Sequence, residues 1–264
     1  MKKIFVVGNK TSKSLSPLIF NHWFKKYKIN ATYGFIEVEK NKFKKTIQKT
    51  LSDKDVVGLN VTIPYKKEIM KIISTLNKHA KKINAVNCIV NKKTTTGVNT
   101  DWVGYKNIIK TQNFNKSKNI IILGYGGASQ AISYYFFSTG YKNVFIFNRS
   151  KKLINNQKKK RVFTKKYSKI EGYLEKADLI INTTPINPLS KKHLSSVDKK
   201  TLISDIVYRP KETRFLKAFK KNKKIFGITM LLNQAIPCFK LWFGFEPKID
   251  IGLIKKINKI ITWL

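Results

Sequence analysis

The sequence predicts an α/β protein with two domains, each built around a parallel sheet. Short β-branched runs alternate with amphipathic patterns from the first residue, which is typical of strands alternating with helices. A glycine-rich turn at 124–129 joins a buried-type strand to a helix, and the polar stretch 112–119 separates two α/β units. With 264 residues, the chain is long enough for two domains of ordinary size.

The first unit extends to about residue 100. Strands are expected where β-branched and apolar residues run together, at 3–8, 32–38, 56–63, 83–90 and 97–100. Helices are expected where apolar residues recur at helical spacing, at 16–27, 43–51 and 66–76. Ser16 is expected to cap the first of these helices, with Pro17 in its first turn.

The second unit opens with a helix from about Trp102. A strand–helix–strand pattern follows over 119–150, and further buried-type strands are expected at 177–185 and 201–208. The lysine-rich stretch 151–169 is interpreted as a solvated helix or loop. The tail 228–264 predicts two helices separated by 244–248.

The formal net charge of +40 is a candidate signal for nucleic acid or an anionic membrane. The lysines are scattered along the whole chain, however, and only four residues are arginine, the usual choice for phosphate and base contacts. Compositional bias therefore explains the charge better, and we expect neither a nucleic-acid nor a membrane partner. The positive field would still concentrate anionic ligands.

No segment approaches the roughly 18 consecutive apolar residues that span a bilayer. The apolar run Ile4 to Val7 is too short for a signal peptide. Cys88 and Cys238 are isolated, and the three histidines are scattered, so neither a disulfide framework nor a metal site is expected. These features predict a reduced, cytoplasmic protein.

The turn Gly124-Tyr125-Gly126-Gly127-Ala128-Ser129 indicates a dinucleotide site. Glycine lets the backbone approach a pyrophosphate, and the N-terminus of the following helix supplies free N–H groups and a favourable dipole. The alternative is an ordinary strand-to-helix turn. The strand before it, the helix after it and a second strand at 144–147 favour a Rossmann-type nucleotide domain.

The end of that second strand predicts the cofactor. Enzymes that use NAD usually carry an acid there to bind the ribose hydroxyls, whereas this chain has Asn148-Arg149-Ser150-Lys151. Arg149 can stack on adenine and pair with a 2′-phosphate, which an acid would repel. The sequence therefore favours NADP(H); the alternative is a surface arginine without a ligand.

Seven motifs, in this order, resemble those of the shikimate dehydrogenase family and cover nearly the whole chain. They are Ser14-Leu15-Ser16-Pro17, Asn60 to Lys66 (NVTIPYK), Ala85-Val86-Asn87, Asn99-Thr100-Asp101, the glycine turn, Asn148-Arg149-Ser150, and Met230 to Ala235 (MLLNQA). Each motif alone is unremarkable, but the seven in sequence are specific. The resemblance implies NADP-dependent reduction of 3-dehydroshikimate to shikimate, in the pathway to the aromatic amino acids.

The resemblance also implies a domain organisation and a set of site residues. An N-terminal α/β catalytic domain completed by C-terminal helices would comprise 1–101 and 227–264, with the NADP-binding domain inserted at 102–226. Lys66 and Asp101 match the catalytic pair. The substrate residues would be Ser14, Ser16, Asn60, Thr62, Lys66, Asn87, Asp101, Tyr208 and Gln234. The cofactor residues would be Gly124, Gly126, Gly127, Ala128, Ser129, Asn148, Arg149, Ser150, Lys151, Thr183 and Gly227.

Three positions depart from the family pattern. Phe20 stands where histidine is frequent, which concerns packing. Tyr125 replaces the usual alanine of the glycine turn and puts cofactor affinity in question. Thr229 replaces a common glycine.

The expected chemistry suits Lys66. Reducing a ketone leaves negative charge on oxygen, and a lysine ammonium, protonated at neutral pH, can donate a proton to it. A neighbouring carboxylate such as Asp101 stabilises the ammonium, which favours reduction over oxidation near neutral pH. The alternatives are a solvated lysine, like Lys67, and a helix cap at Asp101.

Other functions are also considered. A shikimate/quinate dehydrogenase with broader substrate or cofactor use is a close variant, although no acid follows the second nucleotide-domain strand. A basic binding protein would show clustered arginine interleaved with aromatics, which is not seen. An inactive NADP sensor fits poorly with both Lys66 and Asp101 in place. Either a monomer or a homodimer is compatible with the sequence.

Overall fold

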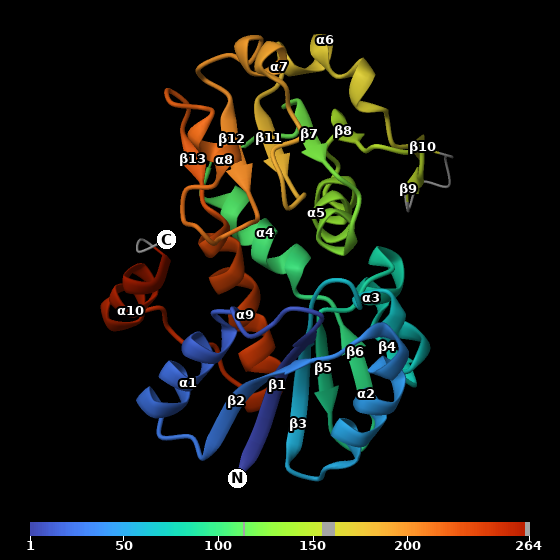
Figure 1. The fold of residues 1–264 in the computed structure, drawn as a ribbon, viewed down its shortest axis with the longest axis vertical. Coiled ribbons are helices and arrows are strands. Elements are labelled where there is room, and N and C mark those ends of the chain that lie inside the picture. Colours follow the sequence, from blue (N-terminus) through green and yellow to red (C-terminus); the bar gives the residue numbers. More distant parts are fainter. Residues whose placement is uncertain (113, 155–161, 262–264) are drawn as a thin grey trace. The chain divides into compact units, whose positions relative to one another are not determined.

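A computed structural model describes residues 1–112, 114–154 and 162–261 (Figure 1). The chain divides into two compact units. Unit 1 comprises Met1–Thr100 and Gln234–Lys259, and unit 2 comprises Asp101–Asn233 with the C-terminal residues from Ile260. An α/β architecture is therefore confirmed, with strands and helices alternating in both units.

Unit 1 contains a six-stranded sheet in the order β2-β1-β3-β5-β6-β4. Its strands are β1 (Lys2–Gly8), β2 (Ala31–Glu37), β3 (Val56–Val61), β4 (Thr75–Leu76), β5 (Cys88–Asn91) and β6 (Thr95–Val98). β1 lies parallel to β2 and β3, but β5 runs antiparallel to both β3 and β6. The expectation of a wholly parallel sheet is thus wrong here. Only residues 92–94 connect β5 to β6, and so short a connection can join only antiparallel strands.

The helical elements of unit 1 cover this sheet. They are α1 (Ser16–Lys26), η1 (Lys40–Lys42), α2 (Phe43–Ser52), η2 (Glu68–Lys71), α3 (Lys78–Ile83), the second half of α9 (Gly227–Phe243) and most of α10 (Ile251–Ile261). The predicted cap of α1 is off by one: Leu15 is the N-cap, and Ser16 is the first helical residue. Pro17 does lie in the first turn.

The helix expected over 66–76 is wrong. That segment forms a turn, the 3-10 helix η2 and then β4. The Lys66 carbonyl accepts a hydrogen bond from Val86 N at 2.8 Å, so it does not serve the fourth residue along as it would in an α-helix. Helix α3, which was not predicted, begins at Lys78, and the side chain of the preceding Asn77 caps it by accepting from Ala80 N at 2.7 Å.

Aromatic side chains fix α1 and α9 on one face of the unit 1 sheet. Phe20 is fully buried and stacks on Tyr33 with ring centroids 4.5 Å apart, so its departure from the family pattern is absorbed by packing. Trp242 donates from its indole nitrogen to Ile89 O at 2.9 Å and occupies the space beside Gly58, where a side chain would collide with it. Helix α9 is thereby held against β3 and β5, which positions Gln234.

Charged side chains connect α1 to the start of α10. Asp250 Oδ2 lies 2.6 Å from Lys26 Nζ and 3.1 Å from His22 Nε2, and Asp250 Oδ1 accepts from Leu253 N at 2.8 Å. These bonds all favour the ionised carboxylate, and the Lys26 hydrogen bond is the largest influence lowering the pKa of Asp250.

Unit 2 contains a five-stranded sheet, in the order β13-β12-β11-β7-β8, in which every pair is parallel. Its strands are β7 (Ile120–Leu123), β8 (Val144–Phe147), β11 (Leu179–Asn182), β12 (Leu202–Asp205) and β13 (Lys224–Ile225). Its helical elements are α4 (Asp101–Lys110), α5 (Gly127–Ser138), η3 (Tyr167–Lys169), α6 (Glu171–Leu174), α7 (Lys191–Ser195), α8 (Arg214–Lys217) and the first half of α9. Helices cover both faces of this parallel sheet, which explains why β7 is apolar throughout and β11 is apolar up to its last residue (Figure 1).

Two hydrophobic clusters lie on the opposite faces of this sheet. Ile120 and Ile122 belong to one cluster, whereas Ile121 and Leu123 belong to the other, as the alternation of a strand requires. The ring of Tyr125 is buried in the first cluster with Ile132 and Tyr135, so the core accommodates this unusual residue.

The lysine-rich stretch 151–169 is only partly described. β9 (Leu153–Ile154) pairs antiparallel with β10 (Val162–Phe163), and residues 155–161 lie outside the described part. The described part thus contains two short paired strands and, at its end, the 3-10 helix η3 (Tyr167–Lys169), but no α-helix.

Candidate functional site

Of the two serines expected to bind a carboxylate, Ser14 lies in the loop between β1 and α1, and Ser16 is the first residue of α1 and is buried. Glu37 Oε1 accepts hydrogen bonds from Thr11 N at 2.7 Å and from Ser12 N at 2.8 Å, which ties the loop to the end of β2. Ser14 Oγ accepts from Ser16 N at 3.2 Å. The bonds from Ser12 and Thr11 lower the pKa of Glu37, because they stabilise its ionised form.

A set of buried polar side chains, here called the amide network, joins β3, the segments flanking β5 and β6, and α9. Its members are Asn60, Asn87, Thr100, Gln234 and Cys238, each no more than 8% exposed. Asn87 Nδ2 donates to Thr100 Oγ1 at 2.9 Å and to Gln234 Oε1 at 3.1 Å, and Asn87 Oδ1 accepts from Thr100 N at 2.7 Å. Three of the predicted substrate residues are thus brought together in unit 1.

Asn60 is committed to this network at both ends of its side chain. Its Oδ1 accepts from the Tyr33 hydroxyl at 2.7 Å, and its Nδ2 donates to Asn87 O at 3.0 Å and to Cys238 Sγ at 3.2 Å. Both donor hydrogens therefore have acceptors inside the protein, and the most direct role of Asn60 is to hold its neighbours.

Lys66 lies in the turn that follows β3. The neighbouring Tyr65 anchors this turn: it stacks on Phe43 at 4.0 Å and donates its hydroxyl to Val38 O at 2.6 Å. Lys66 is half-buried, whereas Lys67 is exposed, and Thr62 is half-buried at the start of the turn. This difference in burial distinguishes Lys66 from the lysine beside it.

Two predicted substrate residues belong to unit 2. Asp101 is the first residue of α4 and is only 4% exposed. Tyr208 is half-buried in the segment after β12, which Asp205 stabilises by accepting from Val207 N at 3.0 Å and from the Thr213 hydroxyl at 2.6 Å. Burial raises the pKa of Asp205, and these hydrogen bonds oppose that shift.

The glycine turn has the geometry that a dinucleotide site needs. Gly124 has a φ of +92°, and a side chain there would lie 2.7 Å from Thr184 Cγ2. Gly126 is the N-cap of α5, and a side chain added there would meet no atom within 4 Å. The space beside Gly126 and the N–H groups that begin α5 suit an anion.

The side chains around the glycine turn mainly stabilise its backbone. Ser129 is fully buried and donates its hydroxyl to Gly124 O at 2.8 Å. Thr183 donates its hydroxyl to Leu123 O at 2.6 Å. Ala128 is half-buried in the first turn of α5. Gly227 begins α9 so close to the backbone of Ile206 and Val207 that any side chain would collide with it.

The basic segment after β8 lies at the surface. Asn148 is half-buried and donates to Ser150 O at 3.1 Å, whereas Arg149, Ser150 and Lys151 are exposed. Tyr167 connects this segment with the glycine turn. Burial raises the pKa of Tyr167 to about 12, and the opposing influences are a hydrogen bond with the Gly124 backbone and the positive charge of Arg149.

Tyr33, Glu37, Tyr167 and Cys238 were missed as site residues in the sequence analysis. Tyr33 and Cys238 contact Asn60 across separations of 27 and 178 residues, and Glu37 contacts Thr11 across 26. No local pattern signals contacts at such distances along the chain.

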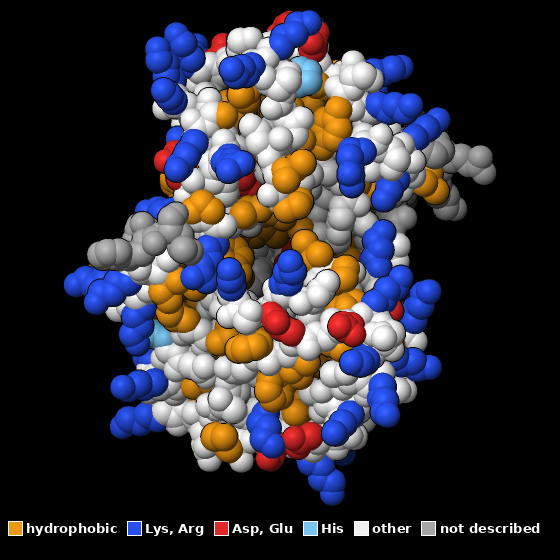
Figure 2. All heavy atoms as spheres, in the orientation of Figure 1, with side chains coloured by type: hydrophobic (Ala, Val, Ile, Leu, Met, Phe, Trp, Pro, Cys, Tyr) orange, Lys and Arg blue, Asp and Glu red, His pale blue; other side chains and the backbone are white. Residues whose placement is uncertain are grey.

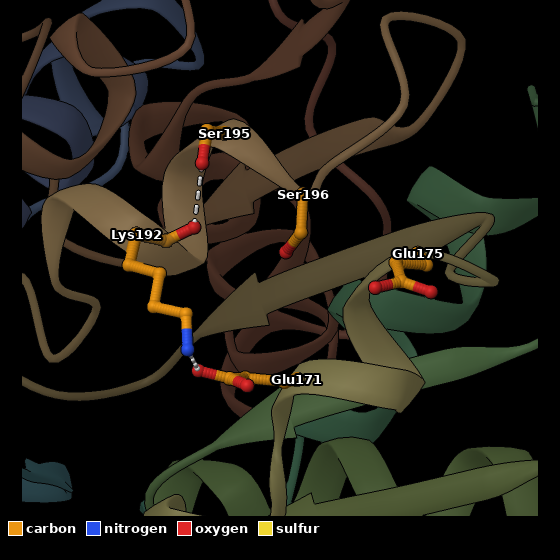
Figure 3. Close-up of a pocket in the computed structure, with 5 residues that line it drawn as sticks. All are labelled: Glu171, Glu175, Lys192, Ser195 and Ser196. Atoms are coloured by element: carbon orange, nitrogen blue, oxygen red, sulfur yellow. Dashed lines mark hydrogen bonds and ion pairs between the residues drawn. The ribbon is translucent and has the colours of Figure 1, made fainter.

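A pocket on α6 and α7 contains none of the predicted site residues. Figure 3 shows its lining by Glu171, Glu175, Lys192, Ser195 and Ser196. Lys192 Nζ pairs with Glu171 Oε1 at 2.9 Å, and Ser195 donates to Lys192 O at 2.8 Å. These partners satisfy one another, and we assign no function to the pocket.

The surface agrees with the scattered charge of the sequence. Figure 2 shows Lys and Arg side chains spread over the visible face rather than gathered into one patch. Among the residues the structure describes, no helix combines the length and apolar character needed to cross a membrane.

Comparison with known families matches both units. Residues 6–89 match the family model "Shikimate dehydrogenase substrate binding domain", and residues 108–212 match "Shikimate / quinate 5-dehydrogenase".

Curated relatives and solved structures agree with this match. The chain is 37% identical to a shikimate dehydrogenase (NADP(+)) of Clostridium beijerinckii over 90% of both chains, and 36% identical to one of Staphylococcus epidermidis over 97% of this chain and 96% of that protein. The crystal structure of shikimate dehydrogenase 1 from Peptoclostridium difficile superposes with a TM-score of 0.81 at 30% identity, covering 100% of this chain and 98% of that one. A shikimate dehydrogenase in complex with NADP+ gives a TM-score of 0.84 at 30% identity over 98% and 96% of the two chains. On this evidence, the chain belongs to the shikimate dehydrogenase family.

Proposed function

We propose that this protein is an NADP-dependent shikimate dehydrogenase, which reversibly reduces 3-dehydroshikimate to shikimate in aromatic amino-acid biosynthesis. The observation that carries the proposal is 36% identity over 97% of the chain to an enzyme of that name. The site is consistent with it, because the polar side chains of unit 1 suit a small hydroxylated acid and the glycine turn of unit 2 suits a dinucleotide.

The domain organisation proposed from the resemblance assigns substrate to 1–101 with 227–264, and NADP to 102–226. The two compact units support this, since they divide between Thr100 and Asp101 and again within α9. The boundary within α9 falls at Gln234, seven residues after the boundary at 227 that the resemblance implies. The first turns of α9 therefore belong to unit 2.

In this proposal, unit 1 binds the substrate through side-chain hydroxyls and side-chain amides. The hydroxyls of Ser14 and Ser16 bind the carboxylate, and Tyr208, a residue of unit 2, keeps the role at the carboxylate that the resemblance gives it. Thr62, Asn87 and Gln234 orient the ring hydroxyls and the carboxylate end, and Asn60 holds the amides in place. Because the amide network is largely bonded within the protein, it is arranged before the substrate arrives.

Lys66 supplies the proton. NADPH, when bound, supplies the hydride that reduces the substrate ketone. The Lys66 ammonium donates a proton to the oxygen on which negative charge develops, and the product is the alcohol. Asp101 stabilises the ammonium and orients it, and in the reverse direction Lys66 takes the proton back.

The cofactor binds to unit 2 in this proposal. The backbone of Gly124, Gly126 and Gly127 and the first turn of α5 receive the pyrophosphate. Arg149, with Asn148, Ser150 and Lys151, receives the adenosine 2′-phosphate. Thr183 and Gly227 complete the site by fixing the chain next to the cofactor.

A reducing cellular compartment fits the two cysteines, which are buried and are not joined in a disulfide. We therefore place the enzyme in the cytoplasm, acting as a monomer or homodimer on a small-molecule substrate.

One assay tests the proposal. Purified protein is mixed with shikimate and either NADP or NAD, and the absorbance of the reduced nicotinamide is followed. We expect rapid reduction of NADP with shikimate and much slower reduction of NAD. Quinate should be assayed separately in place of shikimate, because the matched family model is named for shikimate and quinate. No turnover of shikimate with either cofactor would refute the proposed function.

A further inference from the structure

Cys238 lies at the centre of the amide network. It stands one helical turn after Gln234 on α9 and is completely buried. Its Sγ lies 3.2 Å from Asn60 Nδ2, 3.1 Å from Thr100 Oγ1 and 3.9 Å from Gln234 Oε1. Sulfur therefore contacts a side chain from each of three segments of unit 1.

The hydrogen bonds around the sulfur link it to both ends of the network. The Thr100 hydroxyl accepts from Asn87 Nδ2 at 2.9 Å and lies 3.3 Å from Asn87 Oδ1 and 3.1 Å from Cys238 Sγ. Asn60 Nδ2 donates to Sγ. Sulfur therefore accepts from Asn60, contacts the Thr100 hydroxyl, and is placed to donate its own hydrogen to Gln234 Oε1.

This arrangement fixes the orientation of the Gln234 amide. Its Oε1 accepts from Asn87 Nδ2 at 3.1 Å and faces the thiol, so the oxygen end is held inside the network. In the proposed function, the amide nitrogen is the end of Gln234 that donates to an oxygen of the ligand.

We infer that Cys238 is a positioning residue of the substrate site, which orients Asn60 and Gln234 through its thiol without contacting the substrate. This inference rests on the proposed function, since it takes Gln234 to bind shikimate. It adds that the hydrogen-bonding capacity of the sulfur, and not only its volume, sets substrate affinity.

Two substitutions separate hydrogen bonding from packing. Cys238→Val preserves an apolar side chain of similar size, but it offers Asn60 no acceptor and removes the sulfur that the Thr100 hydroxyl contacts. Cys238→Ser preserves a donor and an acceptor but is smaller and more polar in an apolar place. Cys88→Val is the matched control, because it makes the same change at the other buried thiol of unit 1.

The valine variant is expected to raise the KM for shikimate about tenfold, which corresponds to about 1.4 kcal/mol, with the KM for NADP unchanged. The serine variant is expected to keep the KM for shikimate within about twofold while its melting temperature falls more than that of the valine variant. An unchanged KM in Cys238→Val would overturn the inference. So would a KM that follows the melting temperature across all three variants, because that is the mark of a purely structural role.

A measurement on folded protein keeps the inference testable if the Cys238 variants do not fold. In Cys88→Ser, the only thiol is Cys238, and its S–H stretching band reports its hydrogen bonding. Saturating shikimate is expected to shift that band, and an unshifted band would overturn the inference. Lack of turnover in the unmodified enzyme would instead refute the proposed function.

Discussion

The substrate side and the cofactor side of this protein are built in different ways. In unit 1 the candidate binding groups are buried side chains, of which Asn60 and Asn87 are 6% and 3% exposed, and they bond to one another. In unit 2 the turn is shaped by backbone conformation at Gly124, and the basic side chains after β8 are exposed. The substrate side depends on many contacts between residues that are far apart in the sequence, whereas the cofactor side depends on a short local segment.

This difference predicts how each side responds to substitution. Changes on the substrate side should spread through shared hydrogen bonds, so their effects should not be additive. Changes on the cofactor side should be confined to the binding of one ligand, except where a glycine holds a strained backbone.

The largest effect is expected at Lys66, where chemistry rather than binding is at stake. Lys66→Ala should reduce kcat about 10²–10⁴-fold, the usual range for a general acid–base group. Lys66→Arg should also be severely impaired, because guanidinium holds its proton too firmly. The KM for shikimate should change much less, since the substrate is held by other groups. Steady-state kinetics with shikimate and NADP measure both quantities.

Lys67→Ala is the matched control for this prediction, because Lys67 is exposed whereas Lys66 is half-buried. The Lys67→Ala variant should have nearly unchanged kcat and KM for shikimate. Asp101→Asn should also slow turnover, and the double variant should be little worse than either single variant if the two residues act as a unit. A Lys66→Ala enzyme with near-normal kcat would remove Lys66 from the mechanism.

The next largest effect is expected at Arg149 on the cofactor side. Arg149→Ala should remove about 1.5–3 kcal/mol of charge-assisted hydrogen bonding to the 2′-phosphate. The KM for NADP should therefore rise far more than the KM for NAD, and added salt should reduce the difference between enzyme and variant. Arg214→Ala is the control, since Arg214 is an exposed arginine of the same unit, at the start of α8. Equal KM values for NADP and NAD in the unmodified enzyme would contradict this prediction.

Much of the cofactor side could be predicted from the sequence, because its signals are local. Glycines 124, 126 and 127 stand between a strand and a helix, and Arg149 follows the next strand directly. The substrate side is different. Lys66 and Asn87 were located by resemblance to a family, and no pattern indicated that Cys238 contacts Asn60 from 178 residues away.

Secondary structure was likewise predicted correctly where its signal is local. In the unit 2 sheet, β7 is apolar throughout and β11 is apolar up to its last residue, and both strands were predicted correctly. The helix over 66–76 was not, because the Lys66 carbonyl bonds to Val86 N, a contact that the local amphipathic pattern does not reveal.

Two glycines of the same turn should respond differently to alanine. At Gly124 the positive φ and the nearby Thr184 side chain should make Gly124→Ala cost about 1–3 kcal/mol in the free energy of unfolding. At Gly126 the space is open and φ is −86°, so Gly126→Ala should leave stability unchanged and weaken only NADP binding, where a methyl group would keep the pyrophosphate away. Chemical denaturation and NADP titration of both variants test the pair. Equal stability losses would mean that backbone strain does not distinguish them.

The smallest effect is expected at Glu37, a carboxylate that holds the loop between β1 and α1 through Thr11 and Ser12. Its folded pKa is lowered from 4.5, first by the hydrogen bonds from Ser12 and then by that from Thr11. A lowered pKa means that the ionised group contributes stability above pH 4.5, and that this contribution disappears as the pH falls through the folded pKa. Glu37→Gln should therefore be slightly less stable than the unmodified enzyme at pH 7, and the two melting temperatures should converge in acid.

Glu37→Gln should also raise the KM for shikimate a few-fold at pH 7 with little change in kcat, because a looser Thr11–Ser12 segment positions Ser14 and Ser16 less well. Glu39→Gln is the control, since Glu39 lies two residues further along and its side chain is 73% exposed beside Lys42. If the Glu37 and Glu39 variants had the same KM and the same pH profile of stability, the carboxylate of Glu37 would have no part in ordering the serine loop. The contrast between a prearranged substrate side and a locally shaped cofactor side would then apply only to the buried amide network.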